Sequence, residues 1–176
     1  LMVVAAGMAG YEWFKLMPRK FKHVVKPVAW GYGVLTAALS ALALYFAEVA
    51  LLLWVASIVT WLLSIYWVKT YPEYDGWYNN SLHGIGVVLI SAAVTAIFSV
   101  WQSSPWWLMY LFLLVWGADS GAYFVGRKFG KKKLAPDVSP NKSIEGLYGG
   151  IVTSILIVTA VALLYLEMTW PELILF

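Results

Sequence analysis

Six apolar runs, each close to the length of a membrane-crossing helix, take up most of this sequence. They cover residues 1–17, 28–47, 49–68, 83–101, 105–126 and 147–166, and another run begins at 171–176. A helix needs about 20 apolar residues to cross a bilayer. Only helices and closed barrels satisfy their backbone hydrogen bonds in lipid, and barrel strands are shorter and alternate in polarity. The pattern predicts an all-α fold, a polytopic transmembrane helix bundle of about six spans plus the start of another.

The composition agrees with a membrane protein. Hydrophobic residues make up 62% of the chain and charged residues 12%, whereas a soluble domain carries about 25% charged residues. The absence of cysteine excludes disulfides and cysteine-based metal sites within these residues. We interpret 1–176 as a single transmembrane domain. Because the sequence is already apolar at Leu1 and stops inside the run 171–176, we expect a fragment truncated at both ends and inactive by itself.

Positive charge gathers in alternate loops and predicts the orientation. Loop 18–27 carries four basic residues and loop 127–146 carries six, while loop 69–82 is nearly balanced. The intervening connections contain no Lys or Arg. Since basic loops stay in the cytoplasm, we expect these three loops to be cytoplasmic. Four tryptophans that suit an aromatic belt lie at the opposite helix ends: Trp101, Trp106, Trp107 and Trp170.

One acidic residue, Asp119, lies inside the run 105–126. A carboxylate at such a depth costs on the order of 2.5–3.5 kcal/mol unless a cation, a metal ion or a water-filled cavity offsets it. Tyr123 and Arg127 follow at i+4 and i+8 and share its helical face. Arg127 is about 12 Å away along the axis, too far for direct pairing. We interpret Asp119 as functional, and Glu12 as a weaker candidate that would snorkel or pair with a neighbouring helix.

Glycine pairs spaced four residues apart flank this carboxylate. Gly117 and Gly121 form one pair, and Gly126 and Gly130 form another. Small residues at this spacing let two helices approach closely in a membrane. The pattern predicts close packing of this helix against a neighbour.

The loop 127–146 contains two kinds of positive charge. The triplet Lys131–Lys133 is explained by membrane topology and by attraction to anionic lipid. In "VSPNKSIEG", Ser139 suits a helix cap and Pro140 the first helical position, which would put Lys142 in the first turn. A lysine beside free backbone N–H groups predicts a phosphate site.

This phosphate site is not a P-loop, because Asn141 stands where that motif needs Gly. Arg127, Lys142 and Asp119 are expected to converge on one membrane surface. Cations that hold phosphates, together with a carboxylate that can hold a divalent metal, are parts of a phosphoryl- or nucleotidyl-transfer site.

The stretch "LLVWGADSGAYFVGRKFGKKKLAPDVSPNKSIEGLYGG", from Leu113 to Gly150, resembles the bacterial phosphatidate cytidylyltransferases, also called CDP-diglyceride synthases. The stretch "AAGMAGYEWFKLM" is similar to an early helix of that family. The family's acidic, lysine- and glycine-rich C-terminal signature has no counterpart before Phe176. The resemblance implies that the main metal ligands belong to that signature.

The resemblance also implies an activity and its partners. The family transfers CMP from CTP to phosphatidic acid in the membrane lipid, giving CDP-diacylglycerol and pyrophosphate, and requires Mg²⁺. Asp119 would hold metal or position substrate, while Arg127 and Lys142 would neutralise phosphates. Among the remaining residues, Tyr123, Ser139 and Asn141 would contribute to substrate binding. Glu145 would orient Lys142 or a metal-bound water, or would be a metal ligand beside Asp119. The implied location is the bacterial inner membrane, with the active site toward the cytoplasm, and a homodimer is compatible with it.

Two other functions fit the residues. A related CTP-dependent lipid kinase, acting on a polyprenol or phytol, would use the same groups. In a non-enzymatic transporter or scaffold, Asp119 would serve ion coupling or packing and the basic loop would only set topology.

Overall fold

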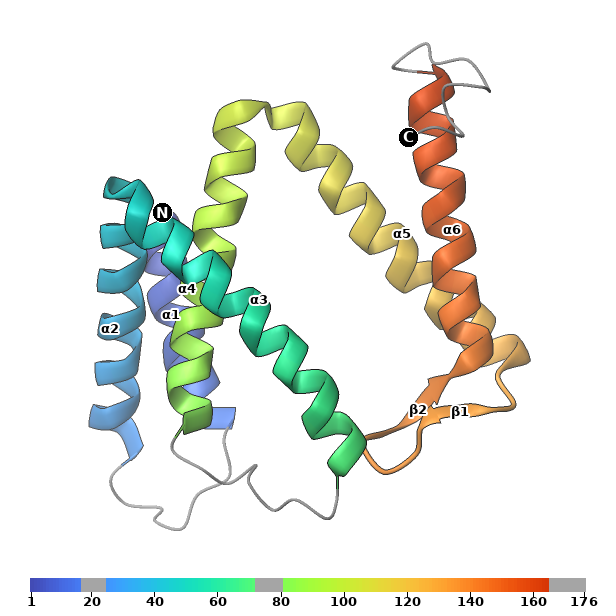
Figure 1. The fold of residues 1–176 in the computed structure, drawn as a ribbon, viewed down its shortest axis with the longest axis horizontal. Helices are drawn as coiled ribbons and strands as arrows, with labels where there is room; N and C mark the ends of the chain where they lie inside the picture. Colours follow the sequence, from blue (N-terminus) through green and yellow to red (C-terminus); the bar gives the residue numbers. More distant parts are fainter. Residues whose placement is uncertain (17–24, 72–80, 165–176) are drawn as a thin grey trace. The chain divides into compact units, whose positions relative to one another are not determined.

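The structure, a computed structural model, describes residues 1–16, 25–71 and 81–164. Its helices are α1 (Met2–Leu16), α2 (Val25–Tyr45), α3 (Ala47–Thr70), α4 (Ser81–Ser103), α5 (Pro105–Phe129) and α6 (Ile144–Leu164). A two-stranded antiparallel hairpin, β1 (Lys133–Ala135) and β2 (Ser139–Ser143), connects α5 to α6 (Figure 1). The predicted all-α fold is confirmed, and the small hairpin is an addition that the apolar pattern did not indicate.

The described part of the chain has five helices that are long and apolar enough to cross a membrane. They are α2 to α6, each within a few residues of a predicted apolar run. The first run forms α1, which has 15 residues and is shorter than the usual span. The run at 171–176, most of loop 18–27 and most of loop 69–82 lie outside the described residues. The chain is a multi-pass membrane protein, and the exact number of spans stays a prediction.

The described residues divide into two compact units, Leu1–Ser103 and Ser104–Phe176, and each is described by itself. In the first unit α4 contacts α1, α2 and α3, and α1 also lies against α2 (Figure 1). Small side chains permit these contacts: a Cβ at Gly7 would lie 3.2 Å from the Cβ of Ala37, and one at Gly33 would lie 2.8 Å from the backbone oxygen of Gly7.

Hydroxyl groups fill much of the interior of the first unit. Thr36, Ser40, Ser91 and Thr95 are all buried. The Ser40 hydroxyl donates to Ser91 Oγ at 3.1 Å, and Trp54 Nε1 donates to Thr95 Oγ1 at 3.1 Å. These bonds join α2 to α4 and α3 to α4. Because lipid offers no competing partner, interhelical hydrogen bonds of this kind hold membrane helices together.

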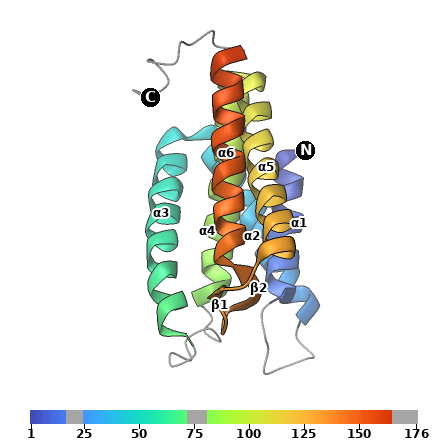
Figure 2. The same ribbon diagram turned by 90° about the vertical axis from the view of Figure 1, so that its right-hand side faces the viewer.

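In the second unit α5 and α6 lie side by side, and the hairpin lies where α5 ends and α6 begins (Figure 2). Ser104 caps α5 by accepting a hydrogen bond from the backbone N–H of Trp106 at 3.3 Å, and Pro105 occupies the first turn. The predicted glycine contact is confirmed. A Cβ at Gly121 would collide with Thr153 Oγ1 and would lie 2.8 Å from the backbone oxygen of Gly149.

The predicted start of the sixth helix is wrong. Ser139 and Pro140 belong to β2, and α6 begins at Ile144. The cap is Ser143, whose Oγ accepts the backbone N–H of Gly146 at 3.1 Å. The physical reason is the turn before β2: Pro136 and Asp137 favour a tight reversal, after which Ser139 pairs with Ala135. Lys142 therefore extends from a strand rather than from the first helical turn.

The glycine contact makes a prediction for stability. Gly121→Ala should destabilise the α5–α6 pair by about 1–3 kcal/mol, because the new methyl group meets a backbone carbonyl that cannot move alone. The matched control is Gly31→Ala in α2, where a Cβ would meet nothing within 4 Å. The control should be neutral or stabilising, since Ala favours helix by about 0.8–1.0 kcal/mol over Gly. Thermal unfolding in detergent measures both, and equal midpoints for the two variants would contradict the packing.

Candidate functional site

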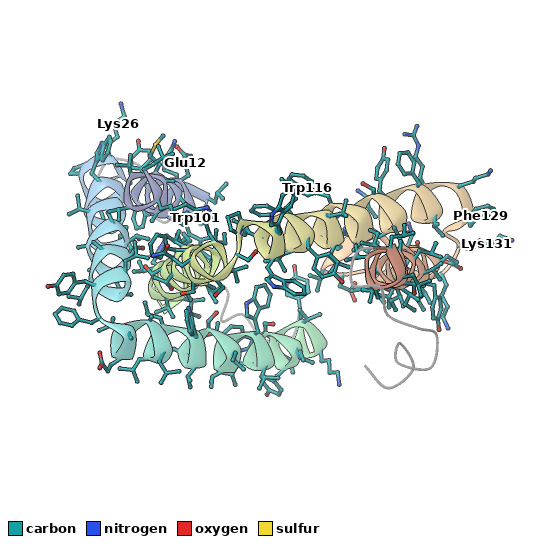
Figure 3. The ribbon with its side chains drawn as sticks, turned by 90° about the horizontal axis from the view of Figure 1, so that it is seen from above. Glu12, Lys26, Trp101, Trp116, Phe129 and Lys131 are labelled. Carbon is teal, nitrogen blue, oxygen red and sulfur yellow. The ribbon has the colours of Figure 1, made fainter. Side chains whose placement is uncertain are left out.

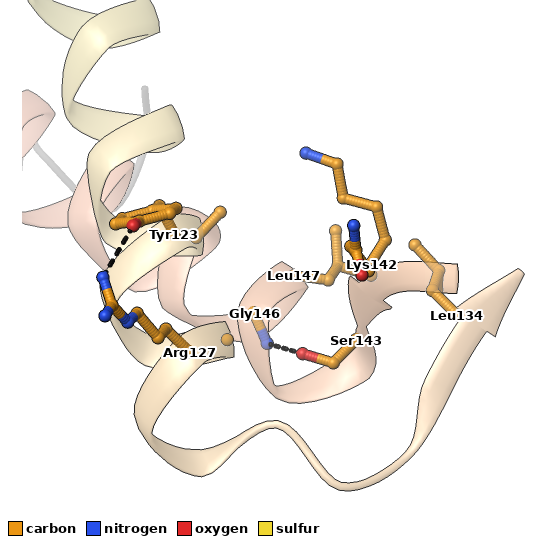
Figure 4. A pocket seen from close by; sticks show the side chains of 10 residues that line it. Tyr123, Arg127, Leu134, Lys142, Ser143, Gly146 and Leu147 are labelled. Carbon is orange, nitrogen blue, oxygen red and sulfur yellow. Dashed lines mark hydrogen bonds between the residues drawn. The ribbon is translucent and has the colours of Figure 1, made fainter. Parts of the chain in front are cut away.

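A cavity of about 570 Å³ opens between the end of α5, the hairpin and the first turn of α6 (Figure 4). Its lining combines small residues from the two helices with polar and cationic side chains. The lining residues are Ala122, Tyr123, Gly126, Arg127, Leu134, Asn141, Lys142, Ser143, Gly146 and Leu147. We call this space the α5–hairpin pocket.

Tyr123 and Arg127 form the α5 side of the pocket. They lie one helical turn apart, and Arg127 Nη1 donates a hydrogen bond of 2.9 Å to the Tyr123 hydroxyl. The guanidinium carbon lies 6.0 Å from the centre of the tyrosine ring. These contacts hold the arginine head back along the helix, as Figure 4 shows. The predicted sharing of one helical face is confirmed, and several guanidinium N–H groups remain available to another acceptor.

Lys142 extends from β2 on the opposite side of the pocket (Figure 4), and Asn141 of the same strand also lines the pocket. Both side chains are exposed. The lining carries two cationic groups, Arg127 and Lys142, and no acidic group. In a partly enclosed space of low polarity, such a pair attracts an anion. The sequence-predicted convergence of these two residues is confirmed, although Lys142 reaches the site from a strand.

The remaining predicted substrate residue, Ser139, does not line the pocket. It lies at the far end of β2, paired with Ala135. Ser143 takes the position next to the cavity instead, and it is buried. A Cβ added at Gly126 would lie 3.3 Å from Ser143 Oγ, so a glycine on α5 leaves room for this cap. Two signals in the sequence could have identified Ser143 as the cap of α6. They are its position three residues before Gly146 and the Pro136–Asp137 turn that precedes β2.

Asp119 lies on α5 two turns before Arg127, exposed in the described unit and outside the lining of the pocket. Within residues 1–16, 25–71 and 81–164, no hydrogen bond or ion pair reaches its carboxylate. The same residues contain no cluster of three His, Cys, Asp or Glu side chains that could hold a metal. A metal site here would therefore need ligands besides Asp119, and the role of Asp119 stays a prediction.

Glu145, in the first turn of α6, binds the backbone of the segment that leads into β1. Its carboxylate accepts the backbone N–H of Lys131 at 3.1 Å and that of Lys132 at 3.2 Å. The carboxylate is thus committed to backbone groups, and it does not line the pocket. Its predicted role as a metal ligand stays a prediction.

The three lysines of the triplet Lys131–Lys133 are exposed, just before and at the start of β1. Figure 3 shows Phe129 and Lys131 at the end of the helix. None of the three lysines lines the α5–hairpin pocket. The geometry thus separates the triplet from Lys142, as the sequence analysis expected.

The weaker candidate, Glu12, forms an exposed ion pair on its own helix. Lys15 Nζ lies 2.9 Å from Glu12 Oε1. A carboxylate paired in this way, three residues from its partner, is explained without a catalytic role.

A second cavity of about 450 Å³ lies near the start of α5. Trp106, Trp107 and Tyr110 contribute to its lining, and Val161 of α6 closes it. No charged side chain lines it. It therefore suits apolar groups rather than phosphates.

Comparison of the sequence with known proteins identifies its family. The model of the cytidylyltransferase family matches residues 1–176. A Pseudomonas aeruginosa protein named phosphatidate cytidylyltransferase is 35% identical over 150 residues, which are 83% of this chain and 51% of that protein. Proteins of the same name from Haemophilus influenzae and Bacillus subtilis are 64% and 49% identical over 50 and 53 residues, covering 28% and 30% of this chain and 17% and 20% of theirs.

No solved structure matches the chain. The chain spans about half the length of the Pseudomonas aeruginosa relative, and the shorter matches cover a fifth or less of the other two. Since the family model matches from the first residue to the last, the chain belongs to the cytidylyltransferase family.

Proposed function

We propose that this chain forms part of the active site of a phosphatidate cytidylyltransferase, which transfers CMP from CTP to phosphatidic acid and releases pyrophosphate. The observation that carries the proposal is the meeting of Arg127 and Lys142 in one cavity at the end of two membrane-spanning helices. Both substrates bear phosphates, and one of them is a lipid whose phosphate lies at the membrane surface. A cationic pocket at a helix end suits that combination. The names of the relatives support the same reaction.

The reaction depends mainly on the positioning of the two substrates. A phosphate oxygen of phosphatidic acid attacks the α-phosphorus of CTP, a new P–O bond forms, and the bond to the bridging oxygen breaks as pyrophosphate leaves. The nucleophile is already anionic, so little proton transfer is needed. Arg127 and Lys142 would neutralise the phosphates and hold the two anions close together. Such charge stabilisation and alignment account for most of the catalysis in phosphoryl-type transfers.

We propose Mg²⁺ as the cofactor, with Asp119 as one of its ligands. The donor chemistry fits, because Mg²⁺ in such sites is bound through one or two carboxylates together with substrate phosphates. The Asp119 carboxylate has no cation partner among the described residues. When bound, the ion would neutralise charge that develops on the phosphates. Asp119 would hold the ion at the membrane-facing side of the site.

The proposed location is the bacterial inner membrane, with the α5–hairpin pocket toward the cytoplasm. The basic residues of loop 127–146 support this orientation, as do the exposed tryptophans Trp101, Trp106 and Trp107 at the opposite helix ends. CTP would then reach the pocket from the cytoplasm and phosphatidic acid from the membrane. A homodimer stays a prediction.

Reaction and orientation are tested together with sealed vesicles that contain the full-length protein. CTP does not cross the bilayer, so inside-out vesicles should convert labelled CTP and phosphatidic acid to CDP-diacylglycerol and pyrophosphate, and right-side-out vesicles should do so only after detergent is added. Release of CDP with a phosphorylated lipid alcohol would identify a lipid kinase instead. Activity confined to right-side-out vesicles would refute the orientation.

Asp119→Asn should abolish or strongly lower this activity while the bundle stays folded. The change keeps the shape of the side chain and removes its charge, and removing an unused charge from a membrane helix should be neutral or stabilising. CMP transfer by the purified variant is compared with its thermal unfolding in the same detergent. Near-normal turnover would return Asp119 to a packing role.

Lys142→Ala should harm the reaction more than simultaneous replacement of Lys131, Lys132 and Lys133 by Ala. If the loop acted only through lipid attraction, the triplet would matter more, at about 1 kcal/mol per charge. A lost contact to developing phosphate charge costs about 2.7–4 kcal/mol, or roughly 10²–10³-fold in rate. The kcat/KM for CMP transfer in detergent micelles, at matched protein levels, decides between them. A triple variant that is damaged as much as Lys142→Ala would reject the assignment of Lys142.

A further inference from the structure

We propose that Glu145 is a positioning residue that fastens the hairpin to the first turn of α6 and thereby sets where Lys142 lies in the α5–hairpin pocket. The inference rests on the proposed function of that pocket. Of the roles that the resemblance implies for Glu145, the contacts of its carboxylate with the hairpin backbone support the orientation of Lys142 rather than the binding of a metal.

Two consecutive peptide groups are held by one carboxylate. Glu145 Oε2 accepts the N–H of Lys131 at 3.1 Å, and Oε1 accepts the N–H of Lys132 at 3.2 Å, with a further contact of 3.3 Å from Lys132 to Oε2. Hydrogen bonds to an ionised acceptor are about twice as strong as neutral ones. A carboxylate in the first turn of a helix is also favoured by the helix dipole. Glu145 can therefore hold this segment although the site is partly open to solvent.

The backbone closes the same connection from the other side. The N–H of Ile144 donates to the carbonyl oxygen of Lys132 at 2.9 Å. The N–H and the C=O of Lys132 are thus both bound by consecutive residues at the start of α6. Lys132 directly precedes β1, and Lys133 pairs with Ser143. The residue before Ser143 is Lys142, so the fastened segment and the pocket cation belong to the same short stretch of ladder.

The location of Glu145 argues against direct contact with substrate. It is absent from the lining of the pocket, and a carboxylate facing a phosphate would repel it. Its effect would pass through the backbone of the hairpin to Lys142 and to Leu134, which both line the cavity. This indirect route distinguishes a positioning residue from a ligand of substrate or metal.

The first arm of the test measures the contact itself. Hydrogen exchange of the backbone amides at 131–135, followed by mass spectrometry of the full-length protein, should be faster in Glu145→Ala than in the unchanged protein. The matched control is Glu48→Ala, which removes an exposed carboxylate from the first turn of another helix, α3, and should leave the exchange at 131–135 unchanged. Unchanged exchange in Glu145→Ala would overturn the proposal.

The second arm measures the link to Lys142. Glu145→Ala should lower kcat/KM for CMP transfer by about 10- to 100-fold, the range expected when a binding group is misplaced by about 1 Å. In a protein that already carries Lys142→Ala, the same change should have little further effect, because residues that act through one another are not additive. Full additivity of the two changes would overturn the proposal, and the control Glu48→Ala should stay near normal.

The third arm separates positioning from metal binding and from misfolding. Glu145→Gln keeps a carbonyl acceptor for one N–H and should retain clearly more activity than Glu145→Ala, with an unchanged Mg²⁺ requirement. Equal loss in both variants together with a raised Mg²⁺ requirement would establish a metal ligand and overturn the proposal. If Glu145→Ala fails to fold, Glu145→Gln carries the exchange and coupling measurements alone. Absence of CMP transfer in the unchanged full-length protein would refute the proposed function, while the exchange result would still judge the contact.

Discussion

The close approach of α5 and α6 along their glycines determines where each group of the candidate site lies. Gly121 lies against Gly149, and Gly126 against Gly146 and Ser143. With side chains at these positions, the helices would have to separate and the hairpin between them would shift. Closely packed helices transmit strain instead of absorbing it. A small separation of α5 and α6 would therefore move Arg127 and Lys142 by a comparable distance. Packing inside the membrane thus sets geometry at its surface.

The hairpin gives the lysines at the end of this helix pair different surroundings. In the proposed site Lys142 faces a substrate phosphate, whereas no lysine of the triplet lines the pocket. Pairing with β1 gives Lys142 a fixed backbone position that an irregular loop would not. Ser143 ends the strand and caps α6 in the same position. One residue therefore joins the polar segment to the span, and the cationic side chain is held within a few residues of the membrane end of α6.

The sequence predicted most of the helical architecture because the physical rule behind it is strict. Backbone groups in lipid must be satisfied within helices, so the apolar runs matched α2 to α6 closely. The face shared by Tyr123 and Arg127 and the glycine packing also followed from helical periodicity. The hairpin did not, because its strands are short and lie in a charged segment without alternation. The start of α6 was misplaced because Ser139–Pro140 has the composition of a helix start, and pairing with β1 overrode that local preference. The contact of Glu145 with the backbone of Lys131 and Lys132 depends on this pairing, and no pattern in the sequence predicted that contact.

The proposed function depends on Arg127 and Lys142 holding the same phosphate-bearing substrates in the α5–hairpin pocket. An experimental structure of the full-length protein with an unreactive CTP analogue and phosphatidic acid tests it most directly. The account predicts phosphate oxygens within about 3 Å of the Arg127 guanidinium and of Lys142 Nζ, the distance of a charge-assisted hydrogen bond. Phosphates bound elsewhere, with both cations facing solvent or lipid headgroups, would contradict it.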